Sequence, residues 1–171
     1  MQAAVGTDNY YRGSIDSNWH VSDLIAVRLN AMYHENDVPG RDVEFYKRWG
    51  VAPAITIGID NPTNLTLQFE HLDDQAMPQY GLRYYANLGG FLDDFDREGY
   101  YGFANLDQQN SKTTALQAIF SHELSDSVSV RNLTRYEHIA QNTVTSQPTC
   151  TFCLASTGSQ PGTFAVPSVQ T

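Results

Sequence analysis

The sequence predicts an all-β fold: an antiparallel transmembrane β-barrel fragment of about seven strands, with short periplasmic turns and long extracellular loops. Successive segments alternate apolar and polar residues with the period of two that is typical of strands. The connections alternate between minimal turns and long polar loops, as they do in outer-membrane barrels. Because the strands of a water-soluble sandwich also alternate, this pattern alone leaves both architectures open.

The N-terminal part predicts one hairpin. We expect a half-strand over residues 2–7, a turn at Asp8-Asn9 and a strand over residues 11–20, in which Trp19 lies on the apolar face. A tight break over residues 21–23 then leads into the central stretch of the chain.

The central stretch predicts three strands, over residues 25–34, 49–60 and 65–70. In each strand one set of alternate residues is apolar, and the other set is polar or small. Residues 34–46 predict a long polar loop, whereas residues 60–64 predict a minimal turn.

A much larger loop follows over residues 73–111, which are rich in Asp, Gly and Tyr. Connections of this length are usually functional or disordered. Two further strands are predicted over residues 112–124 and 128–140, joined by a minimal turn. The chain therefore divides into a partial barrel over residues 1–140 and a loop or disordered end over residues 141–171, which is rich in Ser, Thr, Pro and Gly.

Composition excludes several classes of protein. The chain of 171 residues contains no apolar run of the roughly 20 residues that a transmembrane helix needs, so any membrane span must use strands. The net charge of -9 argues against nucleic-acid binding. The first residues lack the features of a signal peptide, and we therefore expect the chain to begin inside a larger protein.

No arrangement of residues predicts catalysis or a metal site. The five histidines have no ligand spacing, and no Ser-His-Asp set, phosphate-binding glycine loop or paired-carboxylate site is evident. We therefore expect the protein not to be an enzyme.

Six short motifs, taken as an ordered series, resemble the barrel of TonB-dependent siderophore receptors, and within this family the ferric-catecholate receptors. They are RLNAMY at 28–33, VPGRD at 38–42, KRWGVAP at 47–53, LTLQFEH at 65–71, MPQYGL at 77–82 and RNLTRY at 131–136. The resemblance covers about residues 3–140. It leaves the signal peptide, the TonB-binding box, the plug domain and about two thirds of a 22-stranded barrel without a counterpart.

The resemblance implies a function and a location. The complete protein would be a receptor in the bacterial outer membrane, surrounded by lipid, that imports an iron-siderophore complex. TonB would supply the energy through the plug domain, which is absent from this chain. The ferric siderophore is the ligand, and no cofactor is implied.

A ferric catecholate is anionic and has an aromatic rim, so it favours cations and ring faces. The candidate ligand-binding residues that offer these groups are Tyr80, Arg83, Tyr84, Tyr100, Tyr101, Arg41 and Arg48. The same tyrosines would also suit an interfacial aromatic girdle or the internal packing of the loop, and the arginines could be solvated loop charges.

Further charged residues lie on the polar side of the predicted strands. They are Asp16, Arg28, Glu70, Arg131 and Arg135, and we expect them to face the lumen, where they pair with one another or with the plug. Cys150 and Cys153 form a CxxC with no second ligand pair for zinc. We expect them to form a disulfide, because the extracellular face is oxidising.

Two alternative functions remain open from the sequence. A passive outer-membrane porin would have a wide lumen and no plug. A soluble β-sandwich could bind carbohydrate through the Tyr-rich loop, but residues 25–59 would then need a second sheet to cover their apolar side chains.

Overall fold

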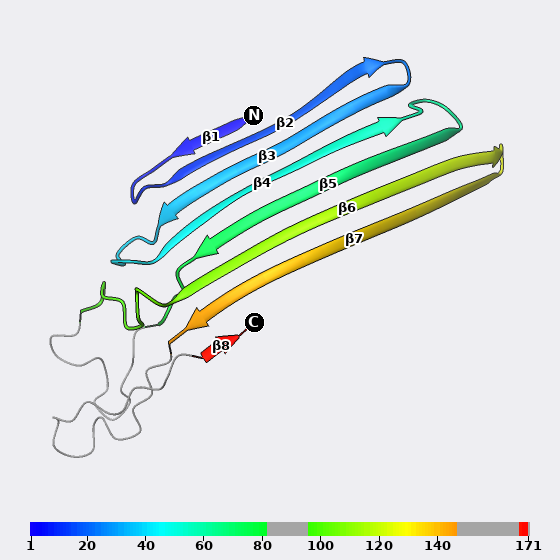
Figure 1. The fold of residues 1–171 in the computed structure, drawn as a ribbon. Coiled ribbons are helices and arrows are strands. Elements are labelled where there is room, and N and C mark those ends of the chain that lie inside the picture. Colours follow the sequence, from blue (N-terminus) through cyan, green and yellow to red (C-terminus); the bar gives the residue numbers. More distant parts are fainter. Residues whose placement is uncertain (82–95, 147–167, 171) are drawn as a thin grey trace, which may run out of the picture.

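The strands form one antiparallel sheet in which each strand pairs with its neighbours in sequence (Figure 1). The computed structural model describes residues 1–81, 96–146 and 168–170. The strands are β1 (Gln2–Val5), β2 (Tyr11–Ser22), β3 (Ile25–Asp37), β4 (Phe45–Ile57), β5 (Thr63–Ala76), β6 (Gln108–Ser125), β7 (Val128–Thr145) and β8 (Ser168–Gln170). No described residue lies in a helix long and apolar enough to cross a membrane.

The register places like residues side by side and so gives the sheet two unlike faces. On the apolar face Val27 lies opposite Ile55, and Ile55 lies opposite Leu67. The large exposed side chains of this face include Trp19, Tyr33, Trp49, Ile57, Leu67, Leu116, Phe120 and Tyr136. Among the described residues the buried apolar positions are few and small, namely Gly50, Ala76, Pro78 and Ala115, so this single layer has no conventional core. A face with this much exposed apolar surface is expected to contact another apolar medium.

The turns and loops separate to opposite ends of the sheet, as the sequence predicts. The connections 23–24, 58–62 and 126–127 lie at one end, which we call the short-turn end. The connections 6–10 and 38–44 lie at the other end, which we call the loop end, together with the end of β5, the start of β6 and the end of β7. Figure 1 shows the long β2 to β7 strands running between the two ends.

The predicted turn at Asp8-Asn9 is confirmed. Both residues have positive φ angles, 57° and 52°, as the central residues of a type I′ hairpin turn require. This connection lies at the loop end although it is short. The strict separation of short from long connections therefore has one exception.

Several strands are longer than predicted, and the loops are correspondingly shorter. The predicted loop 34–46 shrinks to 38–44, and the loop 73–111 shrinks to 77–107. The prediction ended each strand where polar residues begin. Backbone ladder bonds do not depend on side-chain polarity, so pairing continues through polar pairs such as Asp74 and Ser111.

The predicted loop or disordered end over residues 141–171 also contains strand residues. β7 continues to Thr145, and β8 pairs with its last residues, Val144 lying opposite Val169. The eighth strand is an addition to the seven that the sequence predicts. The second sheet that a sandwich would require is not present among the described residues, which all belong to one sheet or its connections.

Candidate functional site

The loop end is held together by a buried polar cluster of four residues from three segments: Tyr80, Tyr100, Asp107 and Ser146. The Asp107 carboxylate accepts hydrogen bonds from Tyr100 Oη at 2.8 Å and Ser146 Oγ at 2.5 Å. The Ser146 amide donates to Tyr80 Oη at 2.5 Å, and the Tyr80 and Tyr100 rings lie 5.5 Å apart. Because these residues lie just after β5, just before β6 and just after β7, the cluster joins three strand ends.

Burial affects the two tyrosines of this cluster. Asp107 is 4% exposed and Ser146 is 2% exposed. Burial raises the pKa of Tyr80, and the nearby Asp107 charge raises it further. Burial and the hydrogen bond to Asp107 raise the pKa of Tyr100 well above its ordinary value. Both phenols are therefore protonated at neutral pH, and the Tyr100 hydroxyl is available as a donor to Asp107.

A second contact ties the β3–β4 loop to the long loop. Arg41 forms an ion pair with Glu44, which is 1% exposed, and its Nε atom donates to Glu44 Oε1 at 2.6 Å. The same guanidinium donates to the backbone oxygens of Arg97 at 3.2 Å and Tyr80 at 3.3 Å. One arginine thus connects segments that are 39 and 56 positions apart in the sequence.

The predicted ligand-binding residues separate into groups in the structure. Arg41, Tyr80 and Tyr100 converge on the bonded network just described. Tyr101 lies nearby and donates to the backbone oxygen of Asp96 at 2.7 Å. Arg48 lies instead on β4, where its Nη2 atom is 2.7 Å from Asp74.

Arg83 and Tyr84 lie outside the described residues, and so do Cys150 and Cys153. The five described candidates all contact other parts of the chain. Their role toward a ligand stays a prediction.

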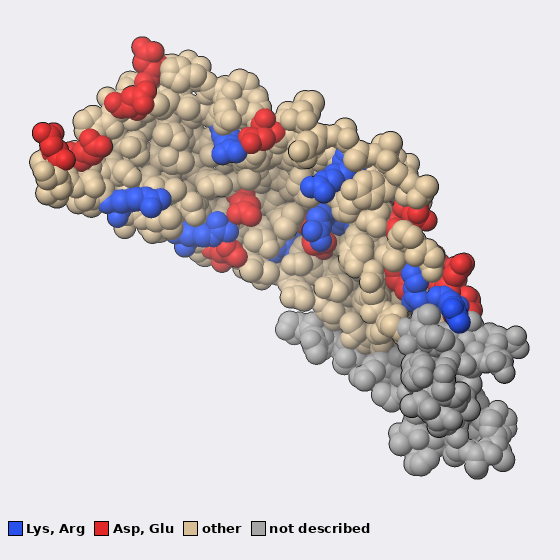
Figure 2. Space-filling view, turned by 180° about the vertical axis from the view of Figure 1, so that it is seen from behind, with Lys and Arg blue, Asp and Glu red and all other residues tan. Residues whose placement is uncertain are grey.

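The polar-side residues do lie on one face, and most of them form ion pairs. Arg28 binds Asp16 through two hydrogen bonds, of 2.9 and 2.7 Å. Arg135 contacts both Glu70, at 3.2 Å, and Glu137, at 2.6 Å. Figure 2 shows basic and acidic side chains side by side along the middle of a sheet face. The cationic charge of these two arginines is therefore balanced within the sheet.

Arg131 differs from these pairs, because its side chain forms no ion pair with any described residue. It lies on β7 opposite Ser121, toward the short-turn end of the polar face.

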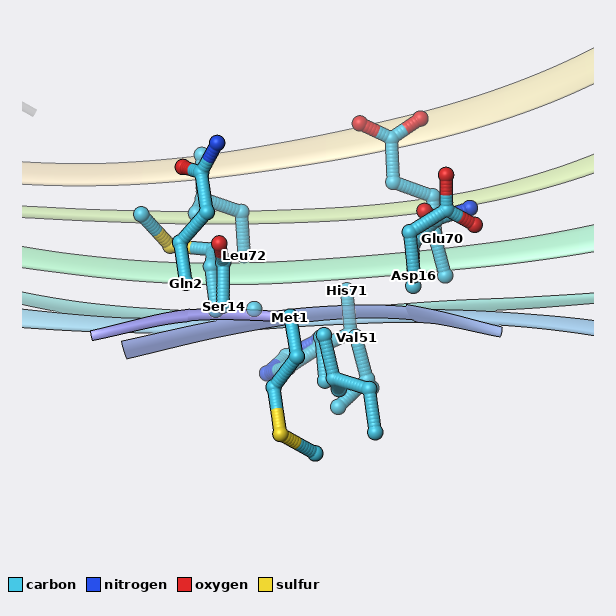
Figure 3. A pocket seen from close by; sticks show the side chains of 14 residues that line it. Met1, Gln2, Ser14, Asp16, Val51, Glu70, His71 and Leu72 are labelled. Carbon is cyan, nitrogen blue, oxygen red and sulfur yellow. The ribbon is translucent and has the colours of Figure 1, made fainter. Parts of the chain in front are cut away.

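A hollow of about 400 Å³ lies in the middle of the sheet. Figure 3 shows Asp16 and Glu70 on the same side of the sheet as Gln2 and Leu72, whereas Val51 points to the opposite side.

Small residues form the floor of this hollow. A Cβ atom at Gly50 would lie 3.0 Å from the His71 backbone oxygen and 3.1 Å from Leu72 Cδ1, so a side chain there would be crowded and its neighbours would have to move slightly. The hollow itself offers space on the polar face for a group that is not part of the sheet.

Aromatic residues on the apolar face occupy two levels. Tyr33 lies directly opposite Trp49, and Trp49 contacts His71 with ring centroids 5.1 Å apart. Tyr136 lies opposite Leu116, closer to the middle of the sheet. Tyr33 and Trp49 thus lie near the loop-side ends of their strands, whereas Tyr136 does not.

Sequence reasoning missed the acidic and hydroxyl residues of the loop end. Asp107, Ser146 and Glu44 are buried and bonded, yet each lies in a polar stretch where nothing local separates it from solvated neighbours. Only their position next to a strand could have indicated that Asp107 and Ser146 are buried. Among the described residues no group of His, Cys, Asp or Glu could hold a metal ion.

Comparison with known proteins finds relatives that are all TonB-dependent or siderophore receptors. BfrD, a probable TonB-dependent receptor of Bordetella pertussis, is 33% identical over an alignment of 153 residues, and the match covers 86% of this chain and 20% of the relative. PiuA, a probable TonB-dependent siderophore receptor of Acinetobacter baumannii, is 32% identical over 85% of this chain and 20% of its own length. The catecholate siderophore receptor Fiu of Escherichia coli is 30% identical over 82% of this chain and 20% of its own length. No protein-family model matches the chain.

Solved structures agree with these relatives. The closed form of the ferric-catecholate import receptor Fiu of Escherichia coli superposes with a TM-score of 0.76 and 28% identity, over 84% of this chain and 22% of that one. The siderophore receptor PiuA of Acinetobacter baumannii superposes with a TM-score of 0.75 and 32% identity, over 85% of this chain and 22% of that one. The chain thus spans about a fifth of the length of the curated relatives it matches.

Proposed function

Since this chain belongs to the TonB-dependent siderophore receptors, of whose barrel it matches one part, we propose that it forms one wall of a receptor that imports ferric catecholate-type siderophores. TonB-dependent receptors are bacterial outer-membrane proteins. The apolar face of the sheet contacts lipid, and the polar face lines the lumen. TonB supplies the energy through a plug domain that lies outside this chain.

The observation that carries the proposal is the match of this sheet to a ferric-catecholate import receptor over 84% of the chain. The two unlike faces support it, because a barrel in lipid needs an apolar outer face and tolerates charge only in its lumen. The charges of the central polar face are paired with one another: Arg28 with Asp16 on the neighbouring strand, and Arg135 with Glu70 across β6.

The loop end provides groups suited to a flat anionic ligand. Tyr101 is 39% exposed, and the side chain of Arg48 is 40% exposed. Tyr80 and Tyr100 use their hydroxyls within the buried cluster, so they contribute ring faces rather than hydroxyls to the ligand. Arg41 holds the β3–β4 loop in place and acts on the ligand through that loop.

Uptake in cells tests the proposal. The full-length receptor is expressed in an Escherichia coli strain that lacks its own catecholate receptors, and uptake of an iron-labelled ferric tris-catecholate is measured with and without TonB. We expect uptake that requires both the receptor and TonB. Uptake that continues without TonB would favour the porin alternative, and no uptake of any iron complex would overturn the proposal.

A further inference from the structure

Three residues on adjacent strands form a row on the polar face near the loop end. Arg12 on β2 lies opposite His34 on β3, and His34 lies opposite Arg48 on β4. We call Arg12, His34 and Arg48 the basic row. Neighbouring strands are about 4.8 Å apart, so the two arginine backbones are separated by about 10 Å with the imidazole between them.

The side chains of the basic row keep hydrogen-bonding capacity unused. The exposed Arg12 side chain makes no hydrogen bond or ion pair with any described residue. Arg48 donates to Asp74 through Nη2, but its buried Nε atom has no partner among the described residues. The buried Nδ1 atom of His34 has none there either, and the Tyr10 ring packs against this imidazole at a centroid distance of 5.2 Å.

A polar hollow of about 250 Å³ opens beside Arg48. Its lining includes Tyr46, Gln79, Gln109 and Ser111, each of which can donate a hydrogen bond, together with Arg48 and the Asp74 carboxylate that Arg48 pairs with. The hollow lies where the strands meet the long loop, between the basic row and the residues after β5. Cations and neutral donors are thus gathered at one place on the polar face.

The rest of the polar face has a different charge balance. In its middle, two arginines face three carboxylates, those of Asp16, Glu70 and Glu137. The basic row has two arginines and one carboxylate partner, Asp74. The basic row therefore has more positive than negative charge, in a chain whose net charge is -9.

We propose that the basic row binds the anionic oxygen atoms of the siderophore complex as it passes from the loops into the lumen. This proposal rests on the proposed function and adds Arg12 and His34 as ligand-contacting residues. Planar guanidinium groups bind oxygen anions through paired hydrogen bonds, and two of them flank one imidazole here. The neutral donors of the adjacent hollow then accommodate the polar rim of the ligand.

Binding to purified full-length receptor in detergent tests the basic row. The variants Arg12→Gln and Arg48→Gln are compared with wild type, using an iron-labelled anionic ferric tris-catecholate and an uncharged ferric trihydroxamate as probes. The matched control is Arg131→Gln, which removes the same charge from the polar face near the short-turn end. Arg12→Lys and Arg48→Lys retain the charge, and electrophoretic mobility without heating verifies that each variant is folded.

Each glutamine variant should weaken binding of the catecholate about tenfold, the usual scale for losing one charged hydrogen bond. Raising the salt concentration should weaken wild-type binding more than variant binding, because charge attraction is screened. The lysine variants should recover part of the affinity, and Arg131→Gln should bind like wild type.

Three results would overturn the assignment. If both glutamine variants fold and bind the catecholate as tightly as wild type, the basic row does not bind the ligand, and the proposed function still stands. An equal loss for the charged and the uncharged probe would mean that the variants disturb the loops rather than an anion contact. No binding of the catecholate by wild type would overturn both the basic row and the proposed function.

Discussion

At the short-turn end each connection is fixed by bonds within the turn or to a neighbouring turn, whereas at the loop end buried side chains join the bases of the longer loops. Gly58 has a φ of +85°, and its amide donates to the Leu24 oxygen of the neighbouring turn at 2.7 Å. At the loop end, Asp107 instead gathers donors from residues 100, 103 and 146. Local conformation organises one end, and contacts between distant segments organise the other.

This difference is consistent with the role that we propose for each end of the sheet. Connections fixed by backbone conformation leave little surface for a ligand, but they close hairpins reliably. A loop that is fixed only at its base can vary in length and sequence beyond that base. The buried cluster therefore holds the ends of β5, β6 and β7 together whatever the length of the loops that join them.

Asp107→Ala should have the largest effect and should be confined to the loop end. The change leaves the donors of Tyr100, Phe103 and Ser146 without their acceptor in a buried site. Each buried donor left unpaired costs about 1–3 kcal/mol, so we expect at least about 3 kcal/mol of local destabilisation. Hydrogen exchange in the full-length receptor measures it.

The contrast between the ends provides the control for this variant. Amides of residues 103 and 146 should exchange faster, and amides of the turns at 58–62 and 126–127 should be unchanged. Uniform acceleration at both ends would mean that the buried cluster stabilises the whole sheet rather than the loop base.

The two ends also differ in how far the sequence predicts them. The strands, the two faces and the turn at Asp8-Asn9 follow from alternation and from turn residues, which act over a few positions. The contact between Asp107 and Ser146 joins residues 39 positions apart, and no local pattern encodes it. For the same reason the basic row was missed, since Arg12, His34 and Arg48 become neighbours only through the strand register.

Strand ends were predicted too short for a related reason. Hydrophobic alternation marks only the part of a strand that faces the apolar medium. The hydrogen-bonded ladder of β5 and β6 continues past it to Ala76 and Gln109. The paired Arg28 and Asp16, by contrast, were predictable as polar-face residues from the period of two alone.

Substitution of one glycine at each end allows a direct comparison of the two ends. Gly58→Ala places a Cβ atom 2.2 Å from the Thr63 oxygen at a φ of +85°, so the turn must shift. Gly40→Ala in the β3–β4 loop has a similar φ, +67°, but nothing within 4 Å of the added atom. The left-handed conformation alone costs about 1–2 kcal/mol, and only Gly58→Ala adds a steric term to it.

The stability of both glycine variants is measured by urea titration of the folded full-length receptor, in which unfolding is followed by mobility on unheated gels. Gly58→Ala should lower the midpoint clearly more than Gly40→Ala. Equal midpoints would mean that the turn at Gly58 relaxes around the new side chain. The short-turn end would then be no more constrained than the loop end.

The smallest effect should come from the middle of the sheet, where Asp16 and Arg28 form an exposed pair. Their side chains are 48% and 53% exposed, so water screens the attraction although two hydrogen bonds join them. A double-mutant cycle with Asp16→Asn and Arg28→Gln should therefore give a coupling energy close to zero. A coupling as large as the effect of Asp107→Ala would mean that the pair is shielded from water in the complete receptor. The hollow beside Asp16 would then be filled by another part of that receptor, and the middle of the polar face would resemble the buried loop end rather than an open wall.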